Sequence, residues 1–190
     1  MEIAFIISSI LISLFALLAV YDGFYLHIFK YQLHNNLESR FEHFTHTIRA
    51  IFFPAILYFL FIKQDSNTSF FIGISIVVLD SIVLGIDAFS ETNSRKFMGG
   101  LPRWEYILHL FVNGFHFASI AVFLAIKIKL INNEVTLVQN FDGIENHSIF
   151  LFIVKNLIPG AIIIAIIHVV TLFASTKIYW NNLRTKITCC

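Results

Sequence analysis

The 190-residue chain has few charged residues and almost no cysteine. Asp, Glu, Lys and Arg make up 13% of it, whereas hydrophobic residues make up 57% and the mean hydropathy is +0.79. This composition excludes a soluble globular domain and indicates an integral membrane protein. The formal net charge of +1 gives no sign of a nucleic-acid partner. The only two cysteines are Cys189 and Cys190, so a disulfide framework is excluded.

Several catalytic motifs are also missing. The chain contains no glycine-rich nucleotide loop, no G-x-S-x-G nucleophile elbow and no H-E-x-x-H zinc motif. His43 and His46 form an isolated H-x-x-H pair without a His-His doublet, so the histidine boxes of membrane fatty-acid desaturases and hydroxylases are absent. No motif identifies a family. Function must therefore be inferred from the polar residues that interrupt the apolar runs.

The sequence does contain five long apolar runs, each near the roughly 20 residues that a helix needs to cross the hydrocarbon core. They predict an all-α, polytopic membrane helix bundle of about five transmembrane helices in a single transmembrane domain, 1–190. No basic residue precedes the first run and no small-residue cleavage site follows it, so we expect a permanent helix and not a signal peptide. The predicted spans are 2–21, 48–63, 69–87, 104–126 and 149–176.

The basic residues that flank the spans predict an orientation. Three lie on one side, Lys63, Lys127 and Lys129. The positive-inside rule then puts the N-terminus outside and the C-terminus, with a tail at 177–190, in the cytoplasm, as in a bacterial inner membrane. Cys189 and Cys190 either carry acyl chains or end a disordered tail, and the second interpretation is favoured. Nine basic residues lie on the cytoplasmic side: Lys30, Arg40, Arg49, Arg95, Lys96, Arg103, Lys177, Arg184 and Lys186.

One short segment occurs twice. "RFEHFTH" at 40–46 returns 63 positions later as "RWEYILH" at 103–109, and each copy has a glutamate followed four residues later by a histidine. The offset aligns the first two spans with the third and fourth. It predicts an internal duplication of a two-helix unit about an axis along the membrane normal. With a two-residue gap, Asp22 corresponds to Asp87.

Carboxylates and imidazoles gather at the cytoplasmic ends of all five predicted spans. Residues four or seven apart share a helix face, and a charged group facing lipid costs a few kcal/mol or more, so these stripes should face one another. Carboxylate and imidazole without thiolate suit iron, manganese or zinc. Soluble di-iron carboxylate bundles use a related Glu-x-x-His spacing. The predicted metal ligands are Asp22, His27, Glu42, His46, Asp80, Asp87, Glu105, His109, His116 and His168.

Other polar residues near this layer are expected to orient the ligands. They are Arg40, Arg49, Glu91, Arg103 and Asn113.

A buried salt-bridge network is the alternative to a metal site. In it the three arginines Arg40, Arg49 and Arg103 would neutralise the glutamates and Asp87. His43 is expected at the interface because it points away from His46. His34 belongs to a segment, 24–39, that looks like a solvated amphipathic helix at the membrane surface. The segment 88–103 is expected to be a loop over the cytoplasmic mouth.

These features favour a membrane-embedded, dinuclear non-haem metal oxidoreductase. Iron is the favoured metal, and the substrate is a membrane lipid or another hydrophobic small molecule taken from the cytoplasmic side, with a cytoplasmic reductant. A homodimer is compatible with the sequence. The alternatives are a zinc-dependent lipid hydrolase and a small proton or divalent-cation carrier. A carrier is disfavoured because the outer halves of the spans have few polar residues. A haem bound by two histidines is disfavoured because so many carboxylates would surround its iron.

Overall fold

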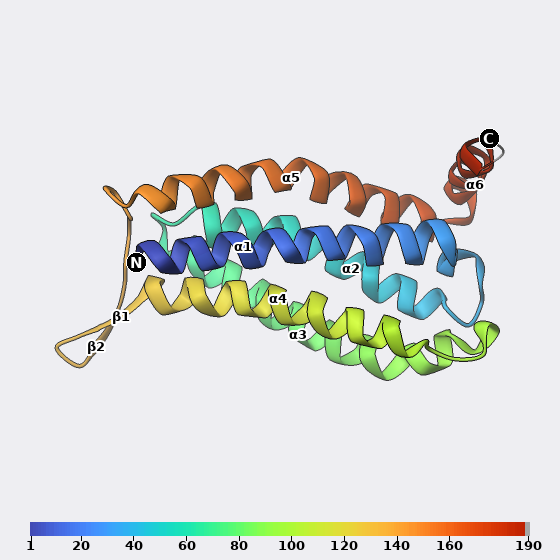
Figure 1. Ribbon diagram of the computed structural model, residues 1–190, viewed down its shortest axis with the longest axis horizontal. Coiled ribbons are helices and arrows are strands. Elements are labelled where there is room, and N and C mark those ends of the chain that lie inside the picture. Colours follow the sequence, from blue (N-terminus) through green and yellow to red (C-terminus); the bar gives the residue numbers. More distant parts are fainter. Residues whose placement is uncertain (189–190) are drawn as a thin grey trace.

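The computed structural model describes residues 1–188, and these fold into an all-α bundle with one short β-hairpin. Five helical segments are long and apolar enough to cross a membrane, which confirms the predicted number. They lie alongside one another, with the N-terminus and the hairpin at one end and α6 at the other (Figure 1). The five segments are Glu2–Lys30, Arg40–Ile62, Asn67–Ser94, Arg103–Lys127 and Glu145–Leu172.

Two of the five segments change their winding along their length. The first begins as an α-helix and continues with the wider i→i+5 bonding of a π-helix, and so does the second. A short sixth helix follows the fifth segment after Phe173. The helices are α1 (Glu2–Ala19), η1 (Val20–Lys30), α2 (Arg40–Ile56), η3 (Leu57–Ile62), α3 (Asn67–Ser94), α4 (Arg103–Lys127), α5 (Glu145–Leu172) and α6 (Ala174–Thr188).

Short turns connect these helices. Two 3₁₀ turns, η2 (Leu33–Asn35) and η4 (Lys96–Met98), lie at the end that carries α6, which we call the polar end. At the opposite, hairpin end, β1 (Ile128–Ile131) pairs antiparallel with β2 (Glu134–Leu137). Asn132 and Asn133 join the two strands with positive φ, the conformation that two-residue hairpin loops favour.

Several helices extend beyond the predicted spans. The first span was predicted to end at 21 and the second to begin at 48, but their helices reach Lys30 and begin at Arg40. Both helices continue past the predicted ends, and polar residues there such as His27 and His46 pair inside the protein. Residues 24–30 of the expected surface helix at 24–39 therefore belong to the first segment. The predicted tail at 177–190 is helical as far as Thr188, and Cys189 and Cys190 lie outside the described residues.

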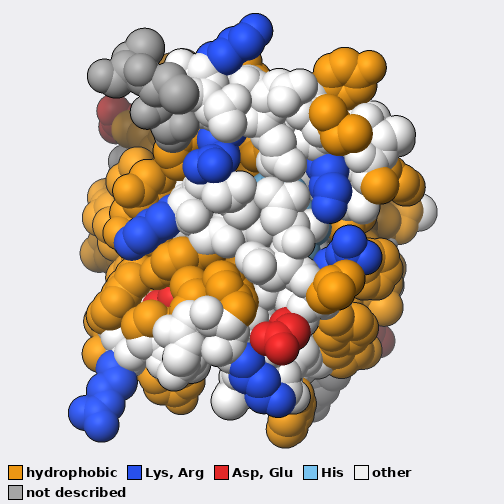
Figure 2. All heavy atoms as spheres, turned by 90° about the vertical axis from the view of Figure 1, so that its right-hand side faces the viewer, with side chains coloured by type: hydrophobic (Ala, Val, Ile, Leu, Met, Phe, Trp, Pro, Cys, Tyr) orange, Lys and Arg blue, Asp and Glu red, His pale blue; other side chains and the backbone are white. Residues whose placement is uncertain are grey.

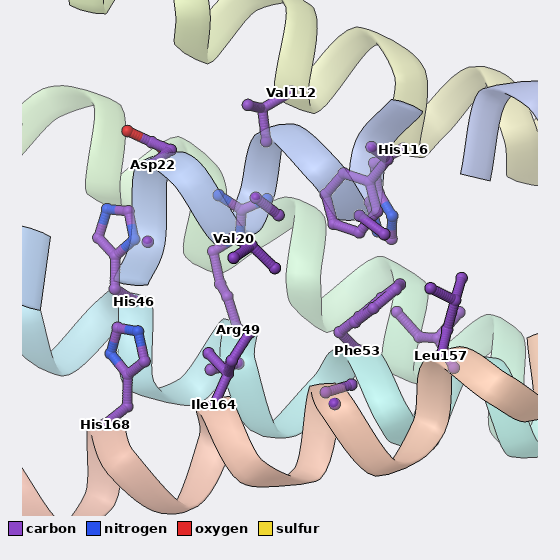
Figure 3. A pocket seen from close by; sticks show the side chains of 18 of the residues that line it. Val20, Asp22, His46, Arg49, Phe53, Val112, His116, Leu157, Ile164 and His168 are labelled. Atoms are coloured by element: carbon purple, nitrogen blue, oxygen red, sulfur yellow. The ribbon is translucent and has the colours of Figure 1, made fainter. Parts of the chain in front are cut away.

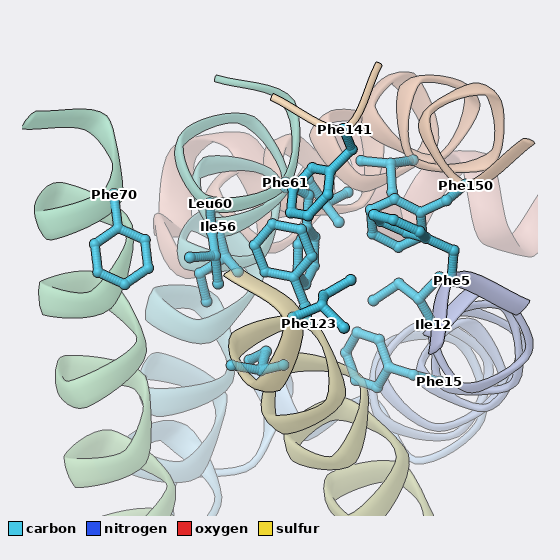
Figure 4. Packing of buried hydrophobic residues seen from close by; sticks show 14 of the residues in the cluster. Phe5, Ile12, Phe15, Ile56, Leu60, Phe61, Phe70, Phe123, Phe141 and Phe150 are labelled. Atoms are coloured by element: carbon cyan, nitrogen blue, oxygen red, sulfur yellow. The ribbon is translucent and has the colours of Figure 1, made fainter. Parts of the chain in front are cut away.

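Aromatic side chains fill the half of the bundle near the hairpin end (Figure 4). Phe61 lies at the centre of this cluster, with its ring centroid 5.0 Å from that of Phe123 and 5.4 Å from that of Phe150. Phe5 joins from α1, 5.5 Å from Phe150. All four side chains are fully buried. Such edge and offset packing gives a dense aromatic core in this half, beside the buried Lys127, whose Nζ donates to the carbonyls of Gln64 and Val138.

The polar half is held by two main helix pairings. The helix α1 packs chiefly against α4 and α5, and α2 chiefly against α3 and α5. These contacts bring η1 beside α4, and α2 beside α3, where the predicted ligands lie. The face of the polar end carries Lys and Arg side chains around a centre of uncharged atoms (Figure 2).

The close approach of α3 to η3 gives a prediction about packing. A Cβ atom added at Gly73 would lie 3.0 to 3.1 Å from the Cα, N and Cβ atoms of Leu60, whereas one at Gly85 would meet nothing within 4 Å. We expect Gly73→Val to lower the free energy of unfolding by about 1–3 kcal/mol through overpacking. Gly85→Val, in the same helix, is the control and should have little effect. Equal loss of stability in both variants, measured by unfolding in mixed micelles, would contradict this packing.

Candidate metal centre

Eight side chains from four spans meet in the polar half and form what we call the carboxylate–histidine cluster. η1, α2, α3 and α4 each contribute two of them. Six are buried, and the side chains of His46 and His109 are only 13% and 12% exposed. The members are Asp22, His27, Glu42, His46, Asp87, Glu91, Glu105 and His109.

The π-helical winding of η1 explains why His27 belongs to the cluster. With i→i+5 bonding, residues five apart fall on the same face of the helix, and Asp22 and His27 are five apart. Nε2 of His27 lies 3.3 Å from Asp22 Oδ1, and the imidazole is fully buried. An ordinary α-helical period would have turned the two residues apart.

His46 lies between two carboxylates. Its Nε2 atom is 3.1 Å from Asp87 Oδ2 and 3.7 Å from Glu42 Oε1, and neither contact is a hydrogen bond. The other carboxylate oxygen of Asp87, Oδ1, accepts a hydrogen bond from the hydroxyl of Thr45. His46 thus pairs with Asp87 on one side and, with Glu42 and His27, belongs to a group that could hold a cation on the other.

His109 has a carboxylate at each of its ring nitrogens. Nε2 is 3.1 Å from Asp22 Oδ1, and Nδ1 contacts Glu91 Oε1 closely. A carboxylate on one nitrogen commonly fixes the tautomer of a histidine that binds a metal through the other. Glu91 can therefore orient His109 so that Nε2 and Asp22 face the cluster.

Two groups of three ligands could hold a metal ion. One consists of Asp22, His27 and His109, and the other of His27, Glu42 and His46, and within each group the nearest ligand atoms lie within 4.8 Å of one another. His27 is common to both, and its ring centroid is 4.3 Å from that of His46. The two candidate groups are therefore adjacent and overlap at His27.

Arg95 was missed by the sequence analysis, although it is fully buried at the centre of this region. Its Nη1 donates to Glu42 Oε2 at 2.7 Å, and its Nη2 donates to Glu105 Oε1 at 2.6 Å. Nη2 also lies 3.0 Å from Nε2 of His27. One guanidinium therefore joins the two glutamates of the repeated segment.

Nothing in the sequence distinguishes Arg95 from Lys96, its exposed neighbour. Both follow α3 in a segment that was expected to be a surface loop. Burial would lower the pKa of the Arg95 guanidinium, but Glu42 and Glu105 more than compensate and raise it above its usual value. Arg95 is thus a fixed positive charge. It leaves Glu42 Oε1 and Glu105 Oε2 buried without a hydrogen-bond partner.

The other predicted ligands lie elsewhere. Asp80 accepts from Arg49 Nε at 3.1 Å and is 3.4 Å from His116 Nε2. Arg49 also donates to Asn113 at 2.8 Å. Asp80, Arg49 and His116 therefore form a separate salt-bridged group, which does not join the cluster. His168 is buried on α5, facing Gly23.

Four side chains lie elsewhere than the sequence suggested. Arg40 and Arg103 were expected to orient or neutralise the glutamates, but both are exposed, and the buried Arg95 bonds to Glu42 and Glu105. His43 was expected at the membrane interface, but it is buried and stacks on His168 with centroids 5.4 Å apart. His34 is also buried, because α6 folds back and Asn181 bonds to its ring at 3.2 Å.

A cavity of about 220 Å³ adjoins the cluster (Figure 3). Asp22 and His46 lie at one end, and Phe53 and Leu157 lie toward the other. Most of the wall is apolar and comes from α1, α2, α4 and α5. Val20 and Gly160 line the cavity and are also exposed, so it opens laterally between the first and fifth spans.

Comparisons with protein-family models, with curated proteins and with solved structures found no match for this chain.

The bridge at Arg95 gives a prediction about stability. Arg95→Gln leaves two buried carboxylates without their cation, so we expect the free energy of unfolding to fall by about 3–5 kcal/mol. Replacing Glu42 and Glu105 by glutamine as well removes the unpaired charges and should recover most of that loss. Denaturation in mixed micelles measures the free energy of unfolding of the single and the triple variant. A triple variant as unstable as the single one would contradict the bridge, and Lys96→Gln is the matched control.

Proposed function

We propose that the protein is a membrane-embedded metalloenzyme with a dinuclear, non-haem centre, iron being the favoured metal. The centre oxidises a lipid or another hydrophobic molecule. Glu42 and His46 would hold one ion and Asp22 and His109 the other, and His27 would complete either group. Asp87 and Glu91 would orient His46 and His109.

The charge of the cluster is the observation that carries the proposal. Its five carboxylates face one guanidinium, which leaves four negative charges when the three imidazoles are neutral. Each uncompensated ion buried away from water costs several kcal/mol. Two divalent cations would supply four positive charges at the place where the unpartnered oxygen and nitrogen atoms converge. Protons are the alternative source of charge, and metal analysis separates the two.

The donor set favours iron among the available metals. Carboxylates outnumber imidazoles and the cluster contains no thiolate, which disfavours copper(I) and iron–sulfur chemistry. Soluble di-iron bundles use a similar mixture on four helices. Zinc hydrolase centres use fewer ligands and more histidine. Bound iron would supply oxygen activation, and the protein would bind the substrate and exclude water.

The cavity supports a hydrophobic substrate. Its apolar walls end at Asp22 and His46, so a molecule that fills it would have one end beside the cluster. The lateral opening between Val20 and Gly160 would admit such a molecule from the bilayer. The aromatic core of the hairpin half favours an enzyme over a carrier, since rings fill most of it and no carboxylate or histidine of the described residues is fully buried there.

The crossed pairing of the spans supports the internal duplication. Asp22 on the first span meets His109 on the fourth, and Asp87 on the third meets His46 on the second. Glu42 and Glu105, at equivalent positions of the repeat, share Arg95. The Lys and Arg side chains at the polar end support a cytoplasmic location for it (Figure 2).

Metal content tests the proposal directly. We expect the purified protein to contain about two iron atoms per chain by elemental mass spectrometry. His46→Ala and His109→Ala should each lose at least one of them. His147→Ala, at the hairpin end, is the matched control and should keep both. About one zinc atom per chain would instead indicate hydrolysis, and folded protein without stoichiometric metal would exclude the proposal.

Filling the cavity tests the route of the substrate separately. A Cβ at Gly160 meets nothing within 4 Å, so leucine fits there and would project into the cavity mouth. We expect Gly160→Leu to retain its metal but to lose lipids that copurify with the wild-type protein, as measured by native mass spectrometry. Gly114→Leu, on the exposed surface of α4, is the control. Unchanged lipid retention in Gly160→Leu would contradict this route.

A further inference from the structure

A second cavity, of about 140 Å³, opens at the polar end and plays no part in the proposed metal centre. It lies between η2, the start of α2, the end of α5 and the start of α6. His34 and His43 line its buried part, and Arg40 and Lys177 line its more exposed part. No Asp or Glu side chain within residues 1–188 lines this cavity.

Arg40 and Lys177 make the cavity positive. They come from different helices, and neither takes part in a salt bridge within residues 1–188. The positive charges of Arg40 and Lys177 repel one another, because no carboxylate of the described residues lines the cavity between them. A bound anion would remove that repulsion and accept charge-assisted hydrogen bonds from both.

Two helix N-termini converge on the same cavity. The 17-residue α2 begins at Arg40, and the 15-residue α6 begins at Ala174. The first N–H groups of a helix have no partner within it and carry partial positive charge, so they favour an anion. The carbonyl groups at the end of α5 carry partial negative charge and disfavour an anion. One of them, Val170 O, is partly neutralised because it accepts a hydrogen bond from the hydroxyl of Thr176 at 2.6 Å.

The buried imidazoles supply a hydrogen-bond acceptor. Thr171 donates its hydroxyl proton to carbonyls of α5, so Nε2 of His43 donates to Thr171 Oγ1 at 3.0 Å. Nε2 of His34 donates to Asn181 Oδ1, which also accepts from Asn35. The Nδ1 atoms of both histidines are therefore left as acceptors, and both are buried without a partner. Burial lowers the pKa of His34, which keeps it neutral.

We propose that this cavity binds a phosphate monoester or inorganic phosphate. The phosphate oxygen atoms accept from the side chains of Arg40 and Lys177, and the positive ends of the α2 and α6 dipoles favour the anion. A hydrogen phosphate group also keeps an O–H that can donate to an unprotonated Nδ1. Sulfate matches the size and charge but lacks that proton. The source is either free phosphate or the headgroup of a monoester phospholipid such as phosphatidic acid at the membrane surface.

Binding measurements on the full chain test this site. Inorganic phosphate is titrated into the protein in a non-ionic detergent and followed by calorimetry, and sulfate is titrated in parallel. Phosphatidic acid is supplied in nanodiscs, and its retention is measured by native mass spectrometry. The variant Arg40→Gln/Lys177→Gln removes both cations. Lys96→Gln/Arg103→Gln makes the same change of charge at exposed positions of the same end and is the control.

We expect wild type and control to bind phosphate or phosphatidic acid, and the cavity variant to bind roughly tenfold or more weakly. Binding of free phosphate identifies a soluble source, and binding of phosphatidic acid alone identifies the lipid. Absence of binding to both, or equal loss in the cavity and control variants, would overturn the proposal. Equal affinity for sulfate would overturn the role of the Nδ1 acceptors. The metal content should not change in either variant, since the two sites are separate.

Discussion

The polar half of the bundle depends on the bridge that Arg95 makes between Glu42 and Glu105. A guanidinium with no exposure to solvent must be neutralised where it lies, and both carboxylates must reach it. This requirement ties α2 and α4 to the segment after α3 at one depth. With those helices in register, Asp22 meets His109 and Asp87 meets His46. The geometry of the candidate metal centre follows from that register.

The two halves of the bundle have opposite energetics. In the hairpin half, rings such as Phe61 and Phe123 are fully buried against one another and contribute stability without any polar partner. In the polar half, buried ionisable groups are destabilising unless each is compensated. A protein that keeps such groups in a membrane generally uses them. The cavity lies where the two halves meet, with an apolar wall and a polar end, and so suits a hydrophobic molecule with one reactive site.

Much of the candidate centre could be predicted because its spacing is local. Glu42 and His46, four apart on one helix, must share a face, and the second copy at Glu105 and His109 indicated a common depth. His27 was harder, because its position depends on π-helical winding that the usual period does not express. His34 and His43 were placed at the surface from the pattern of their own segments, but Asn181 of α6 bonds to His34 and His168 of α5 stacks on His43.

The sequence by itself determined that the chain is a bundle of five long apolar helices with acids and imidazoles gathered at one end. Hydrophobic length and helical period are properties of a single segment, so they can be read without the fold. Only the tertiary structure decided which polar groups meet. It placed Arg95 among the glutamates, left Arg40 and Arg103 outside, and kept Asp80 with Arg49. A pairing of charges depends on which helices are neighbours, and that is set by packing of the whole bundle.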